Sequence, residues 1–187
     1  SEESVSELKS NIESANLQLD ILINNAGTSD PQRFKDLSEE SWNYVLETNL
    51  NGAFRVAKMA TDLMLKNKKG GSIINIASIL GQRVGLNLAS YATSKSALIQ
   101  LTKSMALELA RSNIRVNALA PGYILTEIND DFFATEEGQN YIKKIPMNRL
   151  GLEEDLDGAL LLLSSDASSF MTGSVINIDG GHLINPL

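Results

Sequence analysis

Two side chains near the middle of the chain have the chemistry and the spacing of an acid–base pair. Tyr91 and Lys95 lie in the segment SYATSK (residues 90–95), at the start of a helical pattern. Residues four apart share one face of a helix, so the phenol and the ammonium group are expected to be neighbours. A nearby positive charge favours the phenolate and lowers the tyrosine pKa from its usual value of about 10. Taken alone, such a pair is more often a solvent-exposed feature of a helix.

Two polar residues outside this pair are placed to take part in the same chemistry. Ser78 ends a predicted strand, at the carboxyl edge where open α/β sheets bind ligands, and its hydroxyl is able to hydrogen-bond to a substrate oxygen. Asn49 lies on the apolar stripe of a predicted helix, where a buried amide needs hydrogen-bond partners. Two interpretations of Asn49 are open: it ties down a loop carbonyl, or it holds a water or a backbone carbonyl near Lys95.

The segments that leave two predicted strands are rich in small residues. Asn24-Asn25-Ala26-Gly27 follows the first strand, and Pro121-Gly122, with Thr126 beyond, follows the third. Small residues allow a flat ligand to approach the backbone closely. Ordinary strand-exit turns, with an asparagine bonded to its own loop, are the alternative interpretation.

The elements that position these residues alternate along the chain. Four runs rich in β-branched residues predict strands covered on both faces, at residues 19–24, 72–77, 115–120 and 174–179. Helical patterns cover residues 5–16, 39–66, 89–111 and 152–164. This alternation predicts an α/β fold with a parallel sheet between layers of helices.

The composition excludes several classes of protein. The 187 residues include no cysteine and one histidine, His182, so we expect no disulfide scaffold and no thiolate or histidine metal site. A net charge of -7 argues against a nucleic-acid partner. No apolar stretch approaches the roughly 18 residues of a membrane span, and the first ten residues do not resemble a signal peptide. The lack of cysteine fits a reducing compartment, so a cytoplasmic location is expected.

Taken together, the motifs resemble those of the short-chain dehydrogenases/reductases. In order along the chain they are Asn24–Gly27, Asn49, Ser78, Tyr91-x-x-x-Lys95, Pro121-Gly122 and Ile178-Asp179-Gly180-Gly181. The resemblance is to the single-domain branch and runs from about Leu17 to the C-terminus. It implies a Rossmann-like doubly wound sheet, NAD or NADP as cofactor, and hydride transfer between a secondary alcohol and a ketone.

The resemblance also implies a role for each residue. Tyr91 is expected to be the general acid/base, and Lys95 to lower its pKa and bind the nicotinamide ribose. Ser78 is expected to position the substrate carbonyl, and Asn49 to support a water that relays protons to Lys95. The implied cofactor-binding residues are Asn25, Ala26, Gly27, Tyr91, Lys95, Pro121, Gly122, Ile124 and Thr126.

One departure from the family pattern concerns the start of the chain. A dinucleotide-binding fold carries G-x-G-x-x-G after its first strand, and this sequence does not contain that pattern. We therefore expect residues 1–187 to be the C-terminal and catalytic part of a single Rossmann-like domain, without the N-terminal strands and the phosphate-binding loop. The strand at residues 19–24 is then expected to expose an apolar edge. The choice between NAD and NADP, which is made in the missing part, stays open.

Two other functions compete with the oxidoreductase interpretation. A serine hydrolase is disfavoured because His182 is the only histidine and no G-x-S-x-G surrounds Ser78. A non-catalytic, oligomerising fragment is the stronger rival, since the helices at 39–66 and 89–111 carry many small residues that suit close packing. In the family such helices form dimer and tetramer interfaces, so a homo-oligomer, dimer or homotetramer, is expected.

The substrate is expected to be governed by residues 127–144. The resemblance is to reductases of 3-oxoacyl thioesters on a carrier protein and to polyol or sugar-acid dehydrogenases. Phe132 and Phe133 either cover the substrate or pack this segment onto the body of the protein. The acidic stretch at 127–131 gives no support to an anionic carrier-protein partner, which favours a small-molecule alcohol or ketone.

Overall fold

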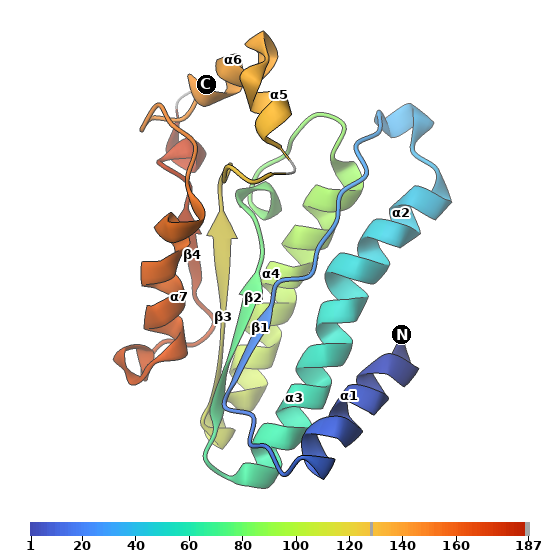
Figure 1. Cartoon of the computed structure of the whole chain (residues 1–187), viewed down its shortest axis with the longest axis vertical. Coiled ribbons are helices and arrows are strands. Elements are labelled where there is room, and N and C mark those ends of the chain that lie inside the picture. The colour runs from blue at the N-terminus through green and yellow to red at the C-terminus, as the bar shows by residue number, and fades with distance from the viewer. Residues whose placement is uncertain (128, 186–187) are drawn as a thin grey trace.

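Four parallel strands form the sheet at the centre of the molecule (Figure 1). The computed structural model describes residues 1–127 and 129–185. The strands lie in chain order as β1 (Ile21–Asn24), β2 (Gly71–Ile76), β3 (Ile114–Pro121) and β4 (Val175–Ile178). Every neighbouring pair is parallel. The predicted parallel α/β fold is therefore confirmed.

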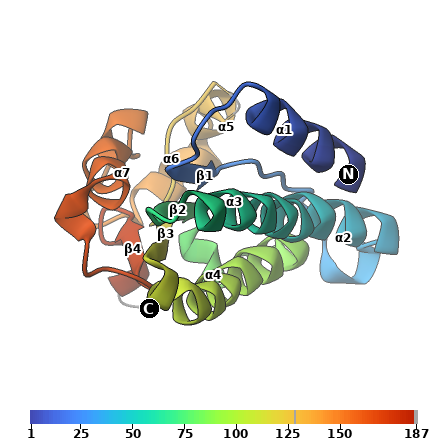
Figure 2. The ribbon, with the colours of Figure 1, turned by 90° about the horizontal axis from the view of Figure 1, so that it is seen from below.

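Helices cover both faces of this sheet. Figure 2 shows α3 (Ala53–Asn67) and α4 (Ala89–Leu109) on one face and α7 (Asp157–Ser164) on the other. The buried side chains divide in the same way, because successive residues of a strand point to opposite faces. Ile73 packs with Met64 of α3, whereas Ile74 packs with Leu163 of α7. The sheet is doubly wound, as predicted.

The predicted helix over residues 39–66 is interrupted. It consists of α2 (Glu39–Leu46), a π-helical segment (Glu47–Gly52) and α3. Asn49 lies in the π-helical segment and is fully buried. A wider turn of this kind is often found where a helix adapts to a functional site. The apolar spacing of this sequence does not distinguish a π turn from an α turn, which is why a single helix was predicted.

The remaining helices lie close to their predicted positions. Helix α1 (Glu2–Ser14) packs on α3, and Lys9 forms an ion pair with Asp62 at 2.7 Å. Helix α7 starts later than predicted because residues 153–156 form a 3-10 turn. Two short helices, α5 (Asp130–Ala134) and α6 (Glu136–Ile142), lie beyond the carboxyl ends of the strands (Figure 1). Ile128, in the segment expected to govern specificity, lies outside the described residues.

Strand β1 is at one edge of the sheet and exposes apolar side chains there. Ile21 and Ile23 are 41% and 43% exposed, whereas Asn24 is buried. This agrees with the exposed apolar edge expected from the sequence. Among the helices in the described part of the chain, none is long and apolar enough to cross a membrane.

Candidate active site

The segments that leave β1, β2 and β3 meet the first turns of α4 around one cavity of about 460 Å³ at the carboxyl edge of the sheet. Parallel strands present their carboxyl ends at the same edge, which is the usual ligand site of an open α/β sheet. The residues that line it are Asn25, Gly27, Thr28, Ser29, Ile76, Ala77, Ser78, Tyr91, Lys95, Pro121 and Gly122. Seven of these are residues that the sequence predicted for the site.

Lys95 projects from α4 into the floor of this cavity. Its side chain is buried, and its Nζ donates a hydrogen bond of 2.8 Å to the carbonyl oxygen of Ile76, at the end of β2. The same Nζ lies 5.7 Å from the centroid of the Tyr91 ring, as expected for residues one helical turn apart. Burial disfavours the charged ammonium and lowers the pKa of Lys95 to about 8.

The pKa of Tyr91 differs from the expectation. Burial raises the pKa of this phenol, and only the adjacent Ser78 hydroxyl, which can hydrogen-bond to the phenolate, acts in the opposite direction. The net effect of folding on this phenol is therefore set by burial, although the Lys95 Nζ lies 5.7 Å from the ring centroid. The i, i+4 spacing predicted the proximity of the two side chains correctly, but it carries no information about burial.

Ser78 is held at the exit of β2 by local backbone contacts. Its backbone is extended, and its Oγ accepts a hydrogen bond of 3.1 Å from the Leu80 amide at the start of a 3-10 turn. This contact fixes the χ1 direction of the hydroxyl, which is buried beside Tyr91. Two hydroxyl groups therefore face one point of the cavity, as the stabilisation of a carbonyl or alcohol oxygen requires.

Asn49 lies directly behind the loop that follows β1. Its Oδ1 accepts from the Thr28 amide at 2.7 Å, and its Nδ2 donates to the Thr28 carbonyl at 2.9 Å and to the Ser94 Oγ at 3.0 Å. These contacts match the interpretation in which Asn49 ties down a loop carbonyl. A Cβ atom added to Gly27 would lie 3.3 Å from the Lys95 Nζ and 3.5 Å from the Asn49 Oδ1. The amide and the ammonium group are thus close to the same glycine, and the proton relay stays a prediction.

The asparagine that ends β1 has a structural role. Asn24 Nδ2 donates to the Asn75 Oδ1 at 2.9 Å and to the Ala53 carbonyl at 3.2 Å, and Asn75 Nδ2 donates to the Thr102 Oγ1 at 2.8 Å. This buried network joins β1 and β2 to α3 and α4. It fixes the point at which Asn25 and Gly27 enter the cavity.

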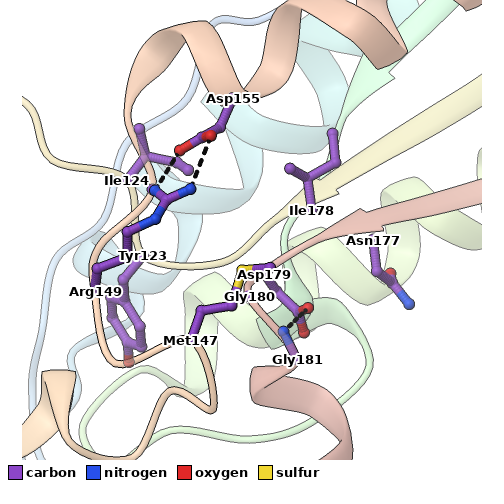
Figure 3. Close-up of a pocket in the computed structure, with 11 residues that line it drawn as sticks. Tyr123, Ile124, Met147, Arg149, Asp155, Asn177, Ile178, Asp179, Gly180 and Gly181 are labelled. Carbon is purple, nitrogen blue, oxygen red and sulfur yellow. Dashed lines mark hydrogen bonds and ion pairs between the residues drawn. The ribbon is translucent and has the colours of Figure 1, made fainter.

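Three predicted cofactor residues do not line this cavity. Ala26 lines a separate cavity of about 330 Å³ between the end of β1, α1 and α3. Ile124 lines the cavity in Figure 3, and the Thr126 amide donates a hydrogen bond to Asn129 within its own loop. Their role in cofactor binding stays a prediction.

The cavity in Figure 3, about 450 Å³, lies between the exit of β3 and the segment after β4. Its charged side chains are already paired within the protein. Arg149 binds both carboxylate oxygens of Asp155, at 2.6 and 3.0 Å, and Asp179 accepts hydrogen bonds from the amides of Gly181 and Leu183. Each of the charged side chains that line this cavity therefore has a partner within the protein.

Sequence reasoning missed several residues next to the motifs. Thr28 and Ser29 extend the lining beyond Gly27, and Tyr123 lines a second cavity that adjoins the first. The position of each directly after a predicted motif is the signal that could have identified them. Phe133 is buried and packs edge-to-face against Tyr123 at 5.8 Å. Of the two interpretations of Phe133, this contact supports packing onto the body of the protein.

Comparisons with known proteins agree with this geometry. A family model described as Enoyl-(Acyl carrier protein) reductase matches residues 1–182. The chain is 42% identical over 172 residues to 2-dehydro-3-deoxy-D-gluconate 5-dehydrogenase of Bacillus subtilis, covering 90% of this chain and 66% of that protein. It is 40% identical over 167 residues to a 3-oxoacyl-acyl-carrier-protein reductase of Thermotoga maritima, covering 89% and 67% respectively. The chain belongs to the short-chain dehydrogenase/reductase family.

Solved structures match over nearly the whole chain. A gluconate 5-dehydrogenase from Burkholderia cenocepacia, in complex with NADP and tartrate, superimposes with a TM-score of 0.93 at 33% identity, covering 97% of this chain and 71% of that one. A short-chain type dehydrogenase/reductase from Mycobacterium marinum gives a TM-score of 0.90 at 37% identity, covering 97% and 72%. The chain thus spans about two thirds of the length of its curated relatives and somewhat more of these structures.

Proposed function

We propose that the protein is an NAD(P)-dependent oxidoreductase that interconverts a secondary alcohol and a ketone. The observation that carries this proposal is the convergence of Tyr91, Ser78 and Lys95 on one cavity at the carboxyl edge of the sheet. Family membership supports the same reaction class.

The nicotinamide end of NAD(P) fits the residues of this cavity. Gly27 leaves free the space beside Lys95 that a side chain would fill, and Pro121 and Gly122 line the same cavity. Asn25, Gly27, Lys95, Pro121 and Gly122 would hold the nicotinamide riboside, and a bound NAD(P)H would supply the hydride. The similar structure from B. cenocepacia contains NADP, so NADPH is the first cofactor to test.

In the direction of reduction, residues of the chain bind the substrate carbonyl and supply the proton. The hydroxyls of Ser78 and Tyr91 donate hydrogen bonds to the substrate carbonyl oxygen and polarise the carbonyl. As the carbonyl carbon gains a hydride, the oxygen takes the Tyr91 proton, and the former π electrons form the new O–H bond. The positive charge of Lys95 stabilises the phenolate that is left. Oxidation of the alcohol follows the reverse course, with the Tyr91 phenolate as the base.

A substrate panel with a matched pair of variants tests this proposal. The native protein is assayed by cofactor absorbance, with NADPH and then NADH for acetoacetyl thioesters and simple ketones, and with NADP and then NAD for gluconate. Ser78→Ala is expected to lower kcat/KM by about 10²–10³, because it removes one donor to the reacting oxygen. Ser96→Ala is the control, since Ser96 is exposed on α4 and bonds to the Gly81 carbonyl. No turnover of any compound, or equal effects of the two variants, would contradict the proposal.

The similarity to the T. maritima enzyme favours reduction of a 3-oxoacyl thioester as a second candidate. The same panel separates it from the first, since acetoacetyl thioesters would then be the preferred substrates.

We also propose that the protein acts as a cytoplasmic homo-oligomer. The absence of cysteine from the sequence supports the location. Exposed apolar side chains on α3 and α4, namely Phe54, Leu65 and Leu107, support self-association. Light scattering on the purified protein would detect a monomer, dimer or tetramer directly.

A further inference from the structure

Ser94 lies between Tyr91 and Lys95 in the sequence, and its side chain is completely buried. Its Oγ donates a hydrogen bond of 2.7 Å to the Tyr91 carbonyl and accepts one of 3.0 Å from the Asn49 Nδ2. The hydroxyl therefore joins the first turn of α4 to the π-helical segment. The reaction proposed above gives this hydroxyl no part.

Asn49 extends this contact to the loop that follows β1. Its Oδ1 accepts from the Thr28 amide at 2.7 Å, and its Nδ2 donates to the Thr28 carbonyl at 2.9 Å. A continuous path of hydrogen bonds thus runs from the backbone of Thr28 through Asn49 and Ser94 to the backbone of Tyr91. Gly27 and Thr28 at one end and Tyr91 at the other line the same cavity.

Ser94 is the point at which this path reaches α4. Within residues 1–127 and 129–185, no other side-chain hydrogen bond joins α4 to Asn49 or to the loop at 25–33. The remaining side-chain bonds that leave α4 go to β2 and to the turn after it. A backbone bond of 2.9 Å from the Gln32 amide to the Asn87 carbonyl holds the far end of the loop to the segment before α4.

A serine that bonds back to a carbonyl one turn earlier is common in helices and has no part in a reaction by itself. Ser104, which is exposed on α4 and donates to the Gln100 carbonyl at 3.2 Å, is an example of this ordinary case. Ser94 differs because its oxygen also accepts from Asn49 and because both side chains are completely buried. Without the Ser94 hydroxyl, one N–H of the Asn49 amide would be buried without a partner, which is unfavourable. The amide would have to move, and its two bonds to Thr28 would move with it.

The proposed reaction needs the two ends of this path in a fixed relation. The nicotinamide riboside would be held beside Gly27, whereas the proton comes from the Tyr91 hydroxyl, and both must reach one carbonyl group. A displacement of about 1 Å between such groups can lower a rate by about 100-fold.

We infer that Ser94 is a positioning residue of the active site: its hydroxyl, through Asn49, sets the place of the loop after β1 relative to Tyr91. The inference rests on the proposed function and adds a residue to the machinery of the same site. It assigns Ser94 no contact with substrate or cofactor.

Ser94→Ala separates positioning from binding. Every residue that lines the cavity is unchanged in this variant, so the KM values for NADPH and for the preferred ketone of the panel should stay within about threefold of the native values. The value of kcat should fall by about 10–100-fold, because the hydride and the proton are no longer delivered in register. A kcat within about threefold of the native value, or a rise in KM with kcat unchanged, overturns the inference.

Ser72→Ala is the control for a loss of stability alone. Ser72 is also buried, and its Oγ donates to the Leu163 carbonyl at 2.7 Å, but it lies near the start of β2, at the opposite end of the strand from the cavity. Both variants should lower the urea midpoint of unfolding, and only Ser94→Ala should lower kcat. An equal loss of kcat in the two variants overturns the inference.

A double variant tests whether Ser94 acts through Asn49. If the two side chains belong to one path, Asn49→Ala already breaks it, and adding Ser94→Ala should change kcat by no more than about threefold. A double variant whose loss of kcat equals the product of the two single losses overturns the shared path.

Hydrogen exchange followed by mass spectrometry keeps the inference separate from the reaction. If the native protein turns over no compound of the panel, the proposed function fails, but the position of the loop can still be measured. Deuterium uptake in residues 25–30 should be about fivefold faster in Ser94→Ala than in the native protein and within about twofold of native in Ser72→Ala. Equal uptake by Ser94→Ala and the native protein overturns the inference.

Discussion

Replacing Asn49 with alanine separates the two interpretations of this buried amide. The substitution removes three hydrogen bonds, two to the backbone of Thr28 and one to the Ser94 hydroxyl. Each such bond contributes about 0.5–1.5 kcal/mol, so their sum is about 2–4 kcal/mol. Thr28 is only partly buried and water can replace part of the loss, whereas the Ser94 hydroxyl keeps its bond to the Tyr91 carbonyl. We therefore expect Asn49→Ala to lower the free energy of unfolding by about 2–3 kcal/mol.

Urea denaturation followed by the fluorescence of Trp42, the only tryptophan, measures this loss. Asn51→Ala is the matched control, because Asn51 lies in the same π-helical segment but is exposed and bonds only to the Glu47 carboxylate. The control should change stability by less than about 0.5 kcal/mol. If Asn49→Ala is as stable as Asn51→Ala yet has lost turnover, the amide acts in the proton relay and the structural interpretation is refuted.

Two further predictions concern burial and close packing. The pKa of Lys95 falls from 10.5 to about 8 on folding, so burial of its charge costs about 3 kcal/mol below pH 8, and this cost disappears as the pH rises from 8 to 10.5. Lys95→Met should therefore be more stable than the native protein in urea at neutral pH, and it should lose turnover. The difference in stability should shrink as the pH rises from 8 to 10.5. A difference in stability that does not change with pH would contradict this prediction. A Cβ at Gly122 would lie 2.8 Å from the Asp179 Cα, so Gly122→Ala should lower the free energy of unfolding by about 1–3 kcal/mol. At Gly158 of α7 an added Cβ would meet no atom within 4 Å, so Gly158→Ala should raise the free energy of unfolding by about 0.4–1 kcal/mol. The same urea titrations measure both glycine variants, and equal effects would show that the close approach at Gly122 is relaxed in solution.

The sequence predicts the strands well because short runs rich in β-branched residues favour buried strands. All four strands lie close to their predicted ranges, and the residues at their carboxyl ends meet as expected. The π-helical segment was not predictable, because the bonds that favour it join Asn49 to Thr28, which is distant in sequence. Tertiary contacts of this kind leave no periodic signal in the helix itself.

The sequence predicts the site residues less completely in the loops that follow the strands. After Gly122 the chain forms a parallel bridge between Ile124 and Gly151, and this turns Ile124 toward the cavity that contains Arg149. Motif order gives the sequence of residues in such a loop but not the direction of each side chain. The pKa of Tyr91 was expected to fall for a similar reason: spacing along a helix predicts a neighbour, whereas burial depends on the whole fold.

In the reaction that we propose, the Tyr91 hydroxyl exchanges a proton with the substrate oxygen. Tyr91→Phe removes only that hydroxyl, so binding of NADPH, followed by its fluorescence, should stay within a few-fold of the native value. With the preferred ketone of the panel, kcat/KM should fall by about 10²–10⁴. Native-like kcat/KM in Tyr91→Phe would show that the proton comes from another group, and the assignment of the active site would then be wrong.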